Sequence, residues 1–208
     1  LSGDRSYPFS RRLETAFGGG KTHALIALTH LGHRGNALAP LVQDLLDPAL
    51  LPAPGEVKVV SIAGDALSVQ KPVGTELRAY TLWGEIALQV GGEGLYRELA
   101  PLLASSAAPA SGDGYFERVF DGRKVLLLID ELAQYAARLD AAQPGGSKQL
   151  AAFFMALYNY ARQRAGLAVV VTLASLANTF ADETKSLAAA LSAVSGREVS
   201  PSEAVAQS

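Results

Sequence analysis

Residues 15–22, which read T-A-F-G-G-G-K-T, decide the fold of this 208-residue chain. The stretch follows the phosphate-loop pattern G-x-x-x-x-G-K-[ST] at Gly20, Lys21 and Thr22, whereas Thr15 stands in place of the first glycine. Consecutive glycines let backbone N–H groups turn inward around an anion, and a helix that begins near Lys21 brings the positive end of its dipole to the same point. We therefore interpret the stretch as a phosphate-binding loop, and favour this over a glycine-rich turn before an amphipathic helix.

The phosphate loop predicts a site for ATP and Mg²⁺. We expect Lys21 to contact the β- and γ-phosphates and the Thr22 hydroxyl to ligate the metal ion. Further nucleotide contacts are expected from the neighbouring residues of the loop and of the first helical turn, namely Phe17, Gly18, Gly19, Gly20 and His23. A first strand is expected at about residues 9–14, although Ser10, Arg11 and Arg12 make it more polar than such strands ordinarily are.

An acidic pair follows the most apolar strand of the sequence. Residues 125–129 (VLLLI) run directly into Asp130 and Glu131. A carboxylate at the carboxyl end of a buried parallel strand lies where such sheets bind ligands. We expect Asp130 to hold Mg²⁺ together with Thr22, and Glu131 to act as the catalytic base that polarises the attacking water. Acidic residues also favour helix N-termini, but that alternative does not explain their place after an apolar strand.

The next strand adds two candidate contacts to the γ-phosphate. Residues 167–173 (LAVVVTL) predict a buried strand, and its end carries Thr172 and Ser175. Either hydroxyl could contact the γ-phosphate or the attacking water. A small polar residue leaving a strand for a turn is an equally good explanation.

Alternating strands and helices predict a three-layer α/β/α fold with a mainly parallel sheet. Besides the strands already named, one is expected at residues 57–63, and helices are expected at 21–31, 39–46, 75–90, 94–104, from 132 to about 139, and 148–164. We assign residues 1–175 to this core, with the Walker A motif at 15–22, the Walker B motif at 125–131 and a sensor strand at 167–175. Residues 176–208 are expected to form a helical and polar extension.

The amino-acid composition excludes several classes of protein. Eighteen basic against twenty acidic residues give a net charge of −2, which argues against a surface built to grip nucleic acid or an anionic membrane. A hydrophobic content of 49% excludes a disordered chain, and the absence of cysteine excludes disulfide scaffolds and thiolate chemistry. No signal peptide or membrane span is evident, so we expect a cytoplasmic protein. Because Met155 is the only methionine and the chain starts at Leu1, we expect a piece of a longer protein.

Several conspicuous residues have simpler explanations than a functional one. His30 and His33 are three apart, but helix histidines without acidic neighbours are expected to be partly exposed rather than to bind a metal. Trp83 is expected in the core, in preference to stacking on adenine. Arg162 and Arg164 close a predicted helix, where cations are ordinarily favourable, although one of them could serve a neighbouring subunit as an arginine finger.

Four stretches carry a resemblance to a known family. They are LETAFGGGKTHALIAL at 13–28, TLWGEIALQVGG at 81–92, LLLIDELAQYAARL at 126–139 and VVVTLAS at 169–175. With them the chain resembles the additional-strand, catalytic-glutamate branch of phosphate-loop NTPases, which includes the AAA+ ATPases. More narrowly, it resembles a prokaryotic ATPase family catalogued as domain of unknown function four-nine-nine.

The resemblance implies more than the motifs do alone. It implies Lys21 and Thr22 as nucleotide and Mg²⁺ residues, Asp130 as the second metal-side group and Glu131 as the base. It implies the sheet order five-one-four-three-two, of which the fifth strand and the lid are not recognisable after Ser175. It also implies a longer parent protein, often encoded beside DNA methylases and thought to act in restriction or phage defence.

Two functions therefore compete at this stage. The first is an ATPase module that drives conformational work in a larger, DNA-related or phage-defence machine. The second is an ATP-binding regulatory or scaffold domain with little or no hydrolysis, which Thr15 and the missing lid favour. A small-molecule kinase is less attractive because no arginine-rich lid is recognisable. Expected partners are ATP, other domains of the parent chain and possibly further copies of it, with nucleic acid contacted only indirectly and no membrane.

Overall fold

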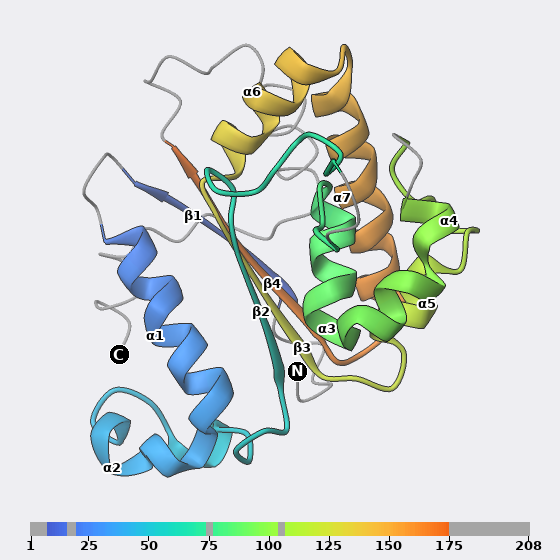
Figure 1. Cartoon of the computed structure of the whole chain (residues 1–208). Helices are drawn as coiled ribbons and strands as arrows, with labels where there is room; N and C mark the ends of the chain where they lie inside the picture. The colour runs from blue at the N-terminus through green and yellow to red at the C-terminus, as the bar shows by residue number, and fades with distance from the viewer. Residues whose placement is uncertain (1–7, 16–19, 74–76, 104–106, 175–208) are drawn as a thin grey trace.

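The computed structural model describes residues 8–15, 20–73, 77–103 and 107–174. They form an α/β fold around a four-stranded, all-parallel sheet with the strand order β1-β4-β3-β2 (Figure 1). All four predicted strands are present, as β1 (Ser10–Thr15), β2 (Lys58–Ala63), β3 (Val125–Asp130) and β4 (Leu167–Ala174). The predicted α/β class and parallel sheet are therefore confirmed.

The position of each strand in the sheet accounts for its composition. β3 and β4 lie in the middle of the sheet, and five consecutive residues of β3 are buried because both of its faces are covered. β1 pairs in parallel with β4, with Ser10 opposite Val169, and is the last strand on that side within the described part of the chain. The side chain of Arg11 in this strand is exposed.

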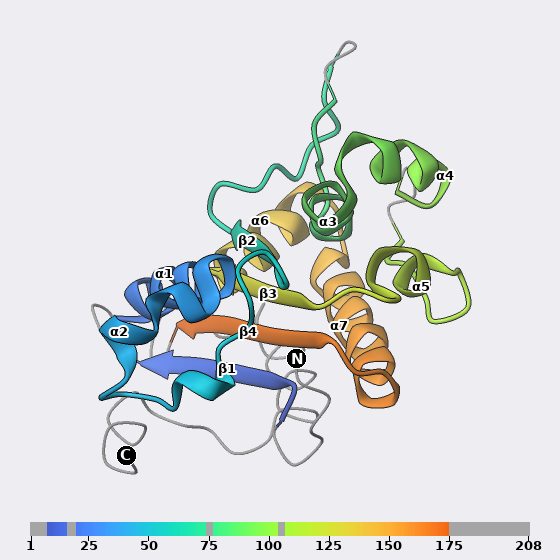
Figure 2. The same cartoon turned by 90° about the horizontal axis from the view of Figure 1, so that it is seen from below.

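Helices cover both faces of the sheet. α1 (Lys21–Arg34) packs on one face, where it contacts all four strands. The opposite side carries the other long helices, with α4 and α5 beside α3 and α7 (Figures 1 and 2). Their bounds are α3 (Leu82–Glu98), α4 (Ala100–Leu103), α5 (Tyr115–Phe120), α6 (Leu132–Ala142) and α7 (Gly146–Gln163). The short helix α2 (Ala39–Val42) and two 3₁₀ turns, Gly35–Leu38 and Pro48–Leu50, follow α1.

Each face has its own hydrophobic core. The larger core lies under α3, α5, α6 and α7 and is rich in aromatic rings, with Phe153 in contact with Trp83, Tyr115 and Phe116. Trp83 is therefore a core residue, as predicted, and is 1% exposed. The smaller core lies under α1 and is aliphatic, made of Leu25, Val57, Val59, Leu126, Leu128 and Val170.

Several predicted helices differ in their bounds from the observed ones. α3 begins at Leu82 rather than near residue 75, because the Thr81 hydroxyl accepts the Gly84 N–H at 3.1 Å and caps the helix there. The expected break at Gly91-Gly92 is a kink within α3, where Gly92 has φ 69°. The helix predicted at 39–46 is helical only over α2 and continues as a turn.

α1 is longer than predicted and contains one buried glycine. Gly32 lies inside the helix, and the close packing requires glycine there because a Cβ atom would lie 2.5 Å from the Val59 Cγ2 methyl. The helix ends at Gly35, whose φ of 51° suits glycine. α5 was not predicted from the sequence. It is a six-residue helix, too short for a clear periodic pattern.

Some predictions fall on parts of the chain that the structure does not describe. These are the loop residues Phe17, Gly18 and Gly19, the strand-end residue Ser175 and the extension 176–208. Among the described residues, no helix has both the length and the apolar character that crossing a membrane requires.

Candidate functional site

The end of the predicted phosphate loop leads directly into a helix N-terminus. Gly20 has φ 76° and ψ 9°, a left-handed conformation that glycine adopts without strain, and it immediately precedes α1. Lys21, Thr22 and His23 follow as the first turn of α1, with Lys21 partly buried and the other two exposed. The first backbone N–H groups of this helix have no partner within it, which makes the turn suited to bind an anion.

The acidic pair lies at the carboxyl end of β3. Asp130 is the last residue of the strand, and Glu131 is the residue from which α6 begins. Glu131 has φ 50° and ψ 38°, and it is the only non-glycine residue with positive φ in the described ranges. A left-handed conformation costs a side-chain-bearing residue about 1–2 kcal/mol and persists where the surroundings enforce it.

The neighbours of Glu131 enforce this backbone conformation. Its N–H lies 3.1 Å from both Asp130 Oδ1 and Thr172 Oγ1, to which it donates. Behind it, the Gly64 N–H donates to the Asp130 carbonyl at 2.8 Å. A Cβ atom at Gly64 would lie 2.5 Å from the Glu131 carbonyl oxygen, so this close approach requires glycine. The turn that contains Gly64 is itself held by Arg138, which donates to the carbonyls of Gly64 and Leu67.

The two predicted halves of the site meet at Asp130. Thr22 Oγ1 donates to Asp130 Oδ2 at 2.7 Å, across 108 positions of sequence. The buried Thr172 hydroxyl donates to Asp130 Oδ1, so both oxygens of this carboxylate are bound by threonines. The structure therefore brings Thr22, Asp130 and Thr172 together. Their roles toward ATP and Mg²⁺, like those of Lys21 and Glu131, stay predictions.

One further residue at this site was missed by the sequence analysis. Gln134 Nε2 donates to Glu131 Oε2 at 2.8 Å, from the first turn of α6. Its position three residues after Glu131, the N-cap residue of α6, is the only sequence signal that could have indicated it.

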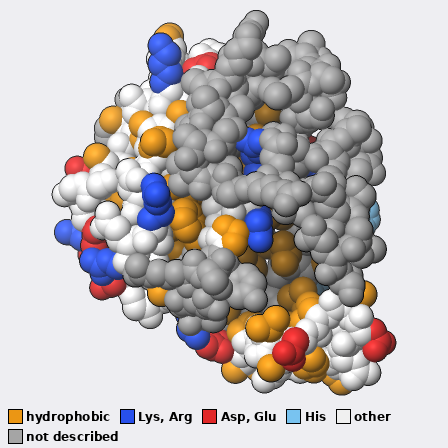
Figure 3. All heavy atoms as spheres, turned by 180° about the vertical axis from the view of Figure 1, so that it is seen from behind, with side chains coloured by type: hydrophobic (Ala, Val, Ile, Leu, Met, Phe, Trp, Pro, Cys, Tyr) orange, Lys and Arg blue, Asp and Glu red, His pale blue; other side chains and the backbone are white. Residues whose placement is uncertain are grey.

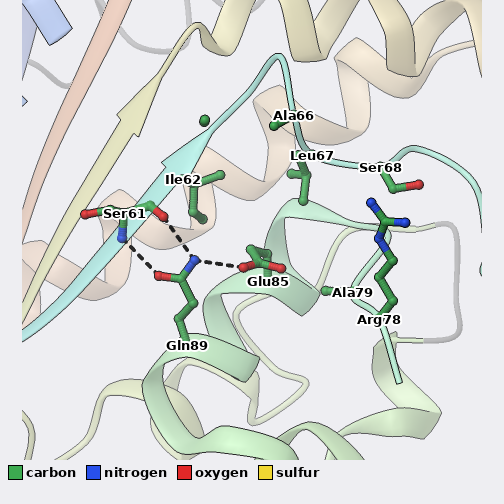
Figure 4. A pocket seen from close by; sticks show the side chains of 10 residues that line it. Ser61, Ile62, Ala66, Leu67, Ser68, Arg78, Ala79, Glu85 and Gln89 are labelled. Atoms are coloured by element: carbon green, nitrogen blue, oxygen red, sulfur yellow. Dashed lines mark hydrogen bonds between the residues drawn. The ribbon is translucent and has the colours of Figure 1, made fainter. Parts of the chain in front are cut away.

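A pocket of about 190 Å³ lies on the other side of the Gly64 turn. Figure 4 shows it between the end of β2, the turn at Ala66–Ser68 and the helix α3, with Glu85 and Gln89 on its wall and Arg78 at one side. Gln89 accepts the Ser61 N–H and donates to the Ser61 carbonyl, both at 3.0 Å, and also donates to Glu85 at 2.7 Å. The Gln89 side chain therefore occupies the backbone hydrogen-bonding groups of Ser61 at the outer edge of β2. No residue of α1 lines the pocket, so it is separate from the phosphate-loop end of that helix.

His23 is exposed in the first turn of α1, at the end of the predicted phosphate loop, and its role toward ATP stays a prediction. His30 and His33, further along the helix, are also exposed, and the described ranges contain no group of three metal-binding side chains. Arg164 pairs with Asp121 at 2.9 Å and lies over the Tyr160 ring, at the end of the sheet opposite Asp130. On the face seen in Figure 3, basic and acidic side chains are interspersed, in keeping with the near-neutral net charge.

Comparison with known proteins places the chain in a family. Residues 11–187 match the DUF499 N-terminal domain, and this match covers the phosphate loop, the acidic pair and all of β2, β3 and β4. A comparison with curated proteins gave no match. Since the matched segment is most of its length, this chain belongs to the DUF499 N-terminal domain family.

Proposed function

We propose that this chain binds ATP with Mg²⁺ and hydrolyses it, as the nucleotide-binding module of a larger machine. The observation that carries the proposal is the 2.7 Å contact between Thr22 and Asp130. It joins the two motifs that phosphate-loop ATPases use for phosphate and metal, at the carboxyl edge of a parallel sheet.

The topology supports the additional-strand, catalytic-glutamate type of phosphate-loop fold. Within the described residues, the order β1-β4-β3-β2 matches the one-four-three-two part of the order five-one-four-three-two. In this arrangement the ends of β1, β3 and β4 are neighbours, which is why the loop, the acidic pair and Thr172 can serve one ligand. The family match agrees with the resemblance seen in the sequence, although the family's description names no activity.

The donor set at Asp130 fits Mg²⁺. This ion prefers oxygen ligands and is ordinarily held by one or two protein groups together with phosphates and water. The Thr22 hydroxyl and the Asp130 carboxylate are such groups, and they lie within hydrogen-bond distance of each other. When bound, the ion neutralises charge on the phosphate oxygens.

The chain's own residues supply the rest of the chemistry. Lys21 and the N–H groups at the start of α1 bind phosphate oxygens, because both carry positive charge or partial charge. Glu131 accepts a proton from the attacking water through Oε1, since its other oxygen is held by Gln134. Thr172 holds Asp130 and the Glu131 backbone in register with each other.

A second candidate function is an ATP-binding regulatory domain with little hydrolysis. Thr15 in place of the first loop glycine favours it. The wider role, conformational work in a cytoplasmic DNA-related or phage-defence machine, rests on the resemblance alone.

Phosphate release and ATP binding, measured side by side, test these functions. Wild type should release phosphate from Mg²⁺-ATP, and Glu131→Gln should lose release while it keeps ATP binding. In a thermal shift assay, ATP at about 100 times its Kd should add about 2.7 kcal/mol of stability. Lys21→Ala should lose this gain, whereas Lys148→Ala, an exposed lysine on α7, should keep it.

Two results would decide against the proposal. If wild type binds ATP but releases no phosphate, in this chain and in the longer parent protein, hydrolysis is wrong and the regulatory function remains. If ATP produces no thermal shift in either protein, both functions are wrong.

A further inference from the structure

We propose that Gln134 is a positioning residue for Glu131, which holds one carboxylate oxygen so that the other faces the attacking water. The proposal rests on the proposed ATPase function and assigns a role to a residue outside both sequence motifs. It is carried by two observations. Gln134 Nε2 donates to Glu131 Oε2 at 2.8 Å, and the backbone N–H of Glu131 is already bonded to Asp130 and Thr172.

The contact is not a helix cap. A glutamine three residues after the N-cap residue ordinarily reaches back to the backbone N–H of that residue. Here the Glu131 N–H is already committed to Asp130 Oδ1 and Thr172 Oγ1, and α6 has no side-chain cap. Gln134 donates to the Glu131 carboxylate instead, so the bond acts on the side chain of the proposed base.

The backbone of Glu131 is fixed by other groups. Its N–H is bound twice, and its carbonyl oxygen packs against Gly64 and accepts the Gln134 and Tyr135 N–H groups at 3.1 and 3.3 Å. The remaining freedom of this residue is rotation of its side chain, since a glutamate has several staggered conformations. Gln134 removes that freedom.

Gln134 is well placed to do this because its own helix is firmly packed. Leu132 and Tyr135, on either side of it in sequence, are both fully buried. The bond to an ionised carboxylate is charge-assisted and directional, and it leaves Glu131 Oε1 without a hydrogen bond among the described residues. A misplacement of about 1 Å at a reacting group can lower a rate about 100-fold, so the orientation of this oxygen matters for hydrolysis.

Two substitutions separate positioning from packing. Gln134→Met keeps the length and helix propensity of glutamine but has no N–H donor. Gln134→Glu keeps the shape but replaces the donor by a second carboxylate. We expect kcat for ATP hydrolysis to fall about tenfold in Gln134→Met and further in Gln134→Glu, with KM and ATP affinity near those of wild type. If Gln134 served only packing, the isosteric glutamate would leave kcat unchanged.

Gln149→Met is the matched control. Gln149 lies on α7, where its side-chain oxygen accepts the Ala108 N–H at 3.0 Å and makes no hydrogen bond to the acidic pair among the described residues. This control should lower the melting temperature and leave kcat unchanged. In a Glu131→Gln background, Gln134→Met should cause no further fall in the residual rate, because the carboxylate that it orients is gone.

The outcomes distinguish this inference from the proposed function. If wild type hydrolyses ATP and folded Gln134→Met and Gln134→Glu retain or exceed its kcat, the positioning role is wrong while the ATPase function stands. If wild type and its longer parent release no phosphate, the ATPase function is wrong and this inference falls with it.

Discussion

The two faces of the sheet are built in different ways. On the side of α3, α5, α6 and α7, aromatic rings pack against one another in a continuous series, and Trp83, Tyr115 and Phe153 are almost fully buried. On the side of α1, Leu25 of that helix packs with five aliphatic side chains of the sheet side, and Ile26 on the same helix remains 51% exposed. Buried apolar area is the main source of folding stability. Most of this stability therefore comes from the side of α3, α5, α6 and α7.

This difference divides the candidate site. The acidic pair continues into α6, which is part of the larger core, whereas Lys21 and Thr22 belong to α1 and depend on the smaller core. Regions with fewer buried apolar contacts open at lower free energy. The phosphate-binding half is therefore expected to be the more adaptable one, and the acidic half the fixed reference against which it moves.

The largest expected effect is the loss of one ring from the larger core. Phe153→Ala should lower the free energy of unfolding by about 3–5 kcal/mol, because it leaves a cavity among Trp83, Tyr115 and Phe116. Leu25→Ala, in the smaller core, should cost about 2 kcal/mol. Urea denaturation of both variants measures this. A greater cost for Leu25→Ala would contradict the comparison between the faces.

Alkaline pH should weaken the larger core selectively. Burial raises the pKa of Tyr135 from 10.0 to about 12, and burial likewise raises the pKa of Tyr158 to about 12. Because the folded state holds these protons more tightly, their contribution is fully present below about pH 10 and is lost as the pH rises toward 12, at about 1.4 kcal/mol per pH unit for each tyrosine.

A stability titration followed by tyrosinate absorbance and urea denaturation tests this dependence. Tyr158→Phe should flatten the loss between pH 10 and 12, since one titrating group is removed. The smaller core contains no tyrosine, so Leu25→Ala should leave the size of this alkaline loss unchanged. A larger alkaline loss in Leu25→Ala would mean that the two faces are not independent.

A substitution under α1 should have a smaller and more local effect. In Gly32→Ala the new Cβ would lie 2.5 Å from Val59 Cγ2, and such overpacking costs about 1–3 kcal/mol, less about 1 kcal/mol for the better helix propensity of alanine. Hydrogen exchange should localise the loss to α1. In a Val59→Ala background, which lacks the clashing methyl, Gly32→Ala should no longer lower the protection of α1. If Gly32→Ala lowers protection equally in both backgrounds, the contact with Val59 does not determine how α1 packs on the sheet.

The smallest effect is expected at the surface, away from both cores. Arg164 and Asp121 form an exposed ion pair at 2.9 Å, and such pairs contribute about 0–1 kcal/mol. Arg164→Ala should therefore change the unfolding free energy little, and the change should shrink further in high salt. A marked fall in ATP hydrolysis in this variant would instead favour the arginine-finger interpretation of Arg164.

Local sequence patterns predicted those parts of the molecule that depend on local physics. The five apolar residues of β3, the glycine before α1 and the acidic pair at the end of β3 each carry a signal within a few positions, and all lie where the patterns indicated. The start of α3 was wrong because Thr81 is one of several polar residues before Leu82. The choice between them is made by which helix start brings Leu82 and Trp83 into the core.

The contacts that complete the candidate site depend on distant parts of the chain. Gly64 is a glycine because the carbonyl of Glu131 approaches it, and Arg138 matters because it holds the turn after β2. No spacing in the sequence connects these positions, since they are neighbours only once β2 and β3 have paired. The hydrogen bond from Gln134 is local, but its partner could be identified only after the Glu131 N–H had been found to be occupied.

The side chain of Gln89 has a consequence for how the sheet can grow. An edge strand with open N–H and C=O groups is a template on which another strand can add, from the same chain or from a second molecule. In β2 the outward groups of Ser61, at the middle of the strand, are already bonded to a side-chain amide that mimics a neighbouring strand. A strand arriving at β2 must displace this amide, so Gln89 protects the protein against edge-to-edge polymerisation on that side.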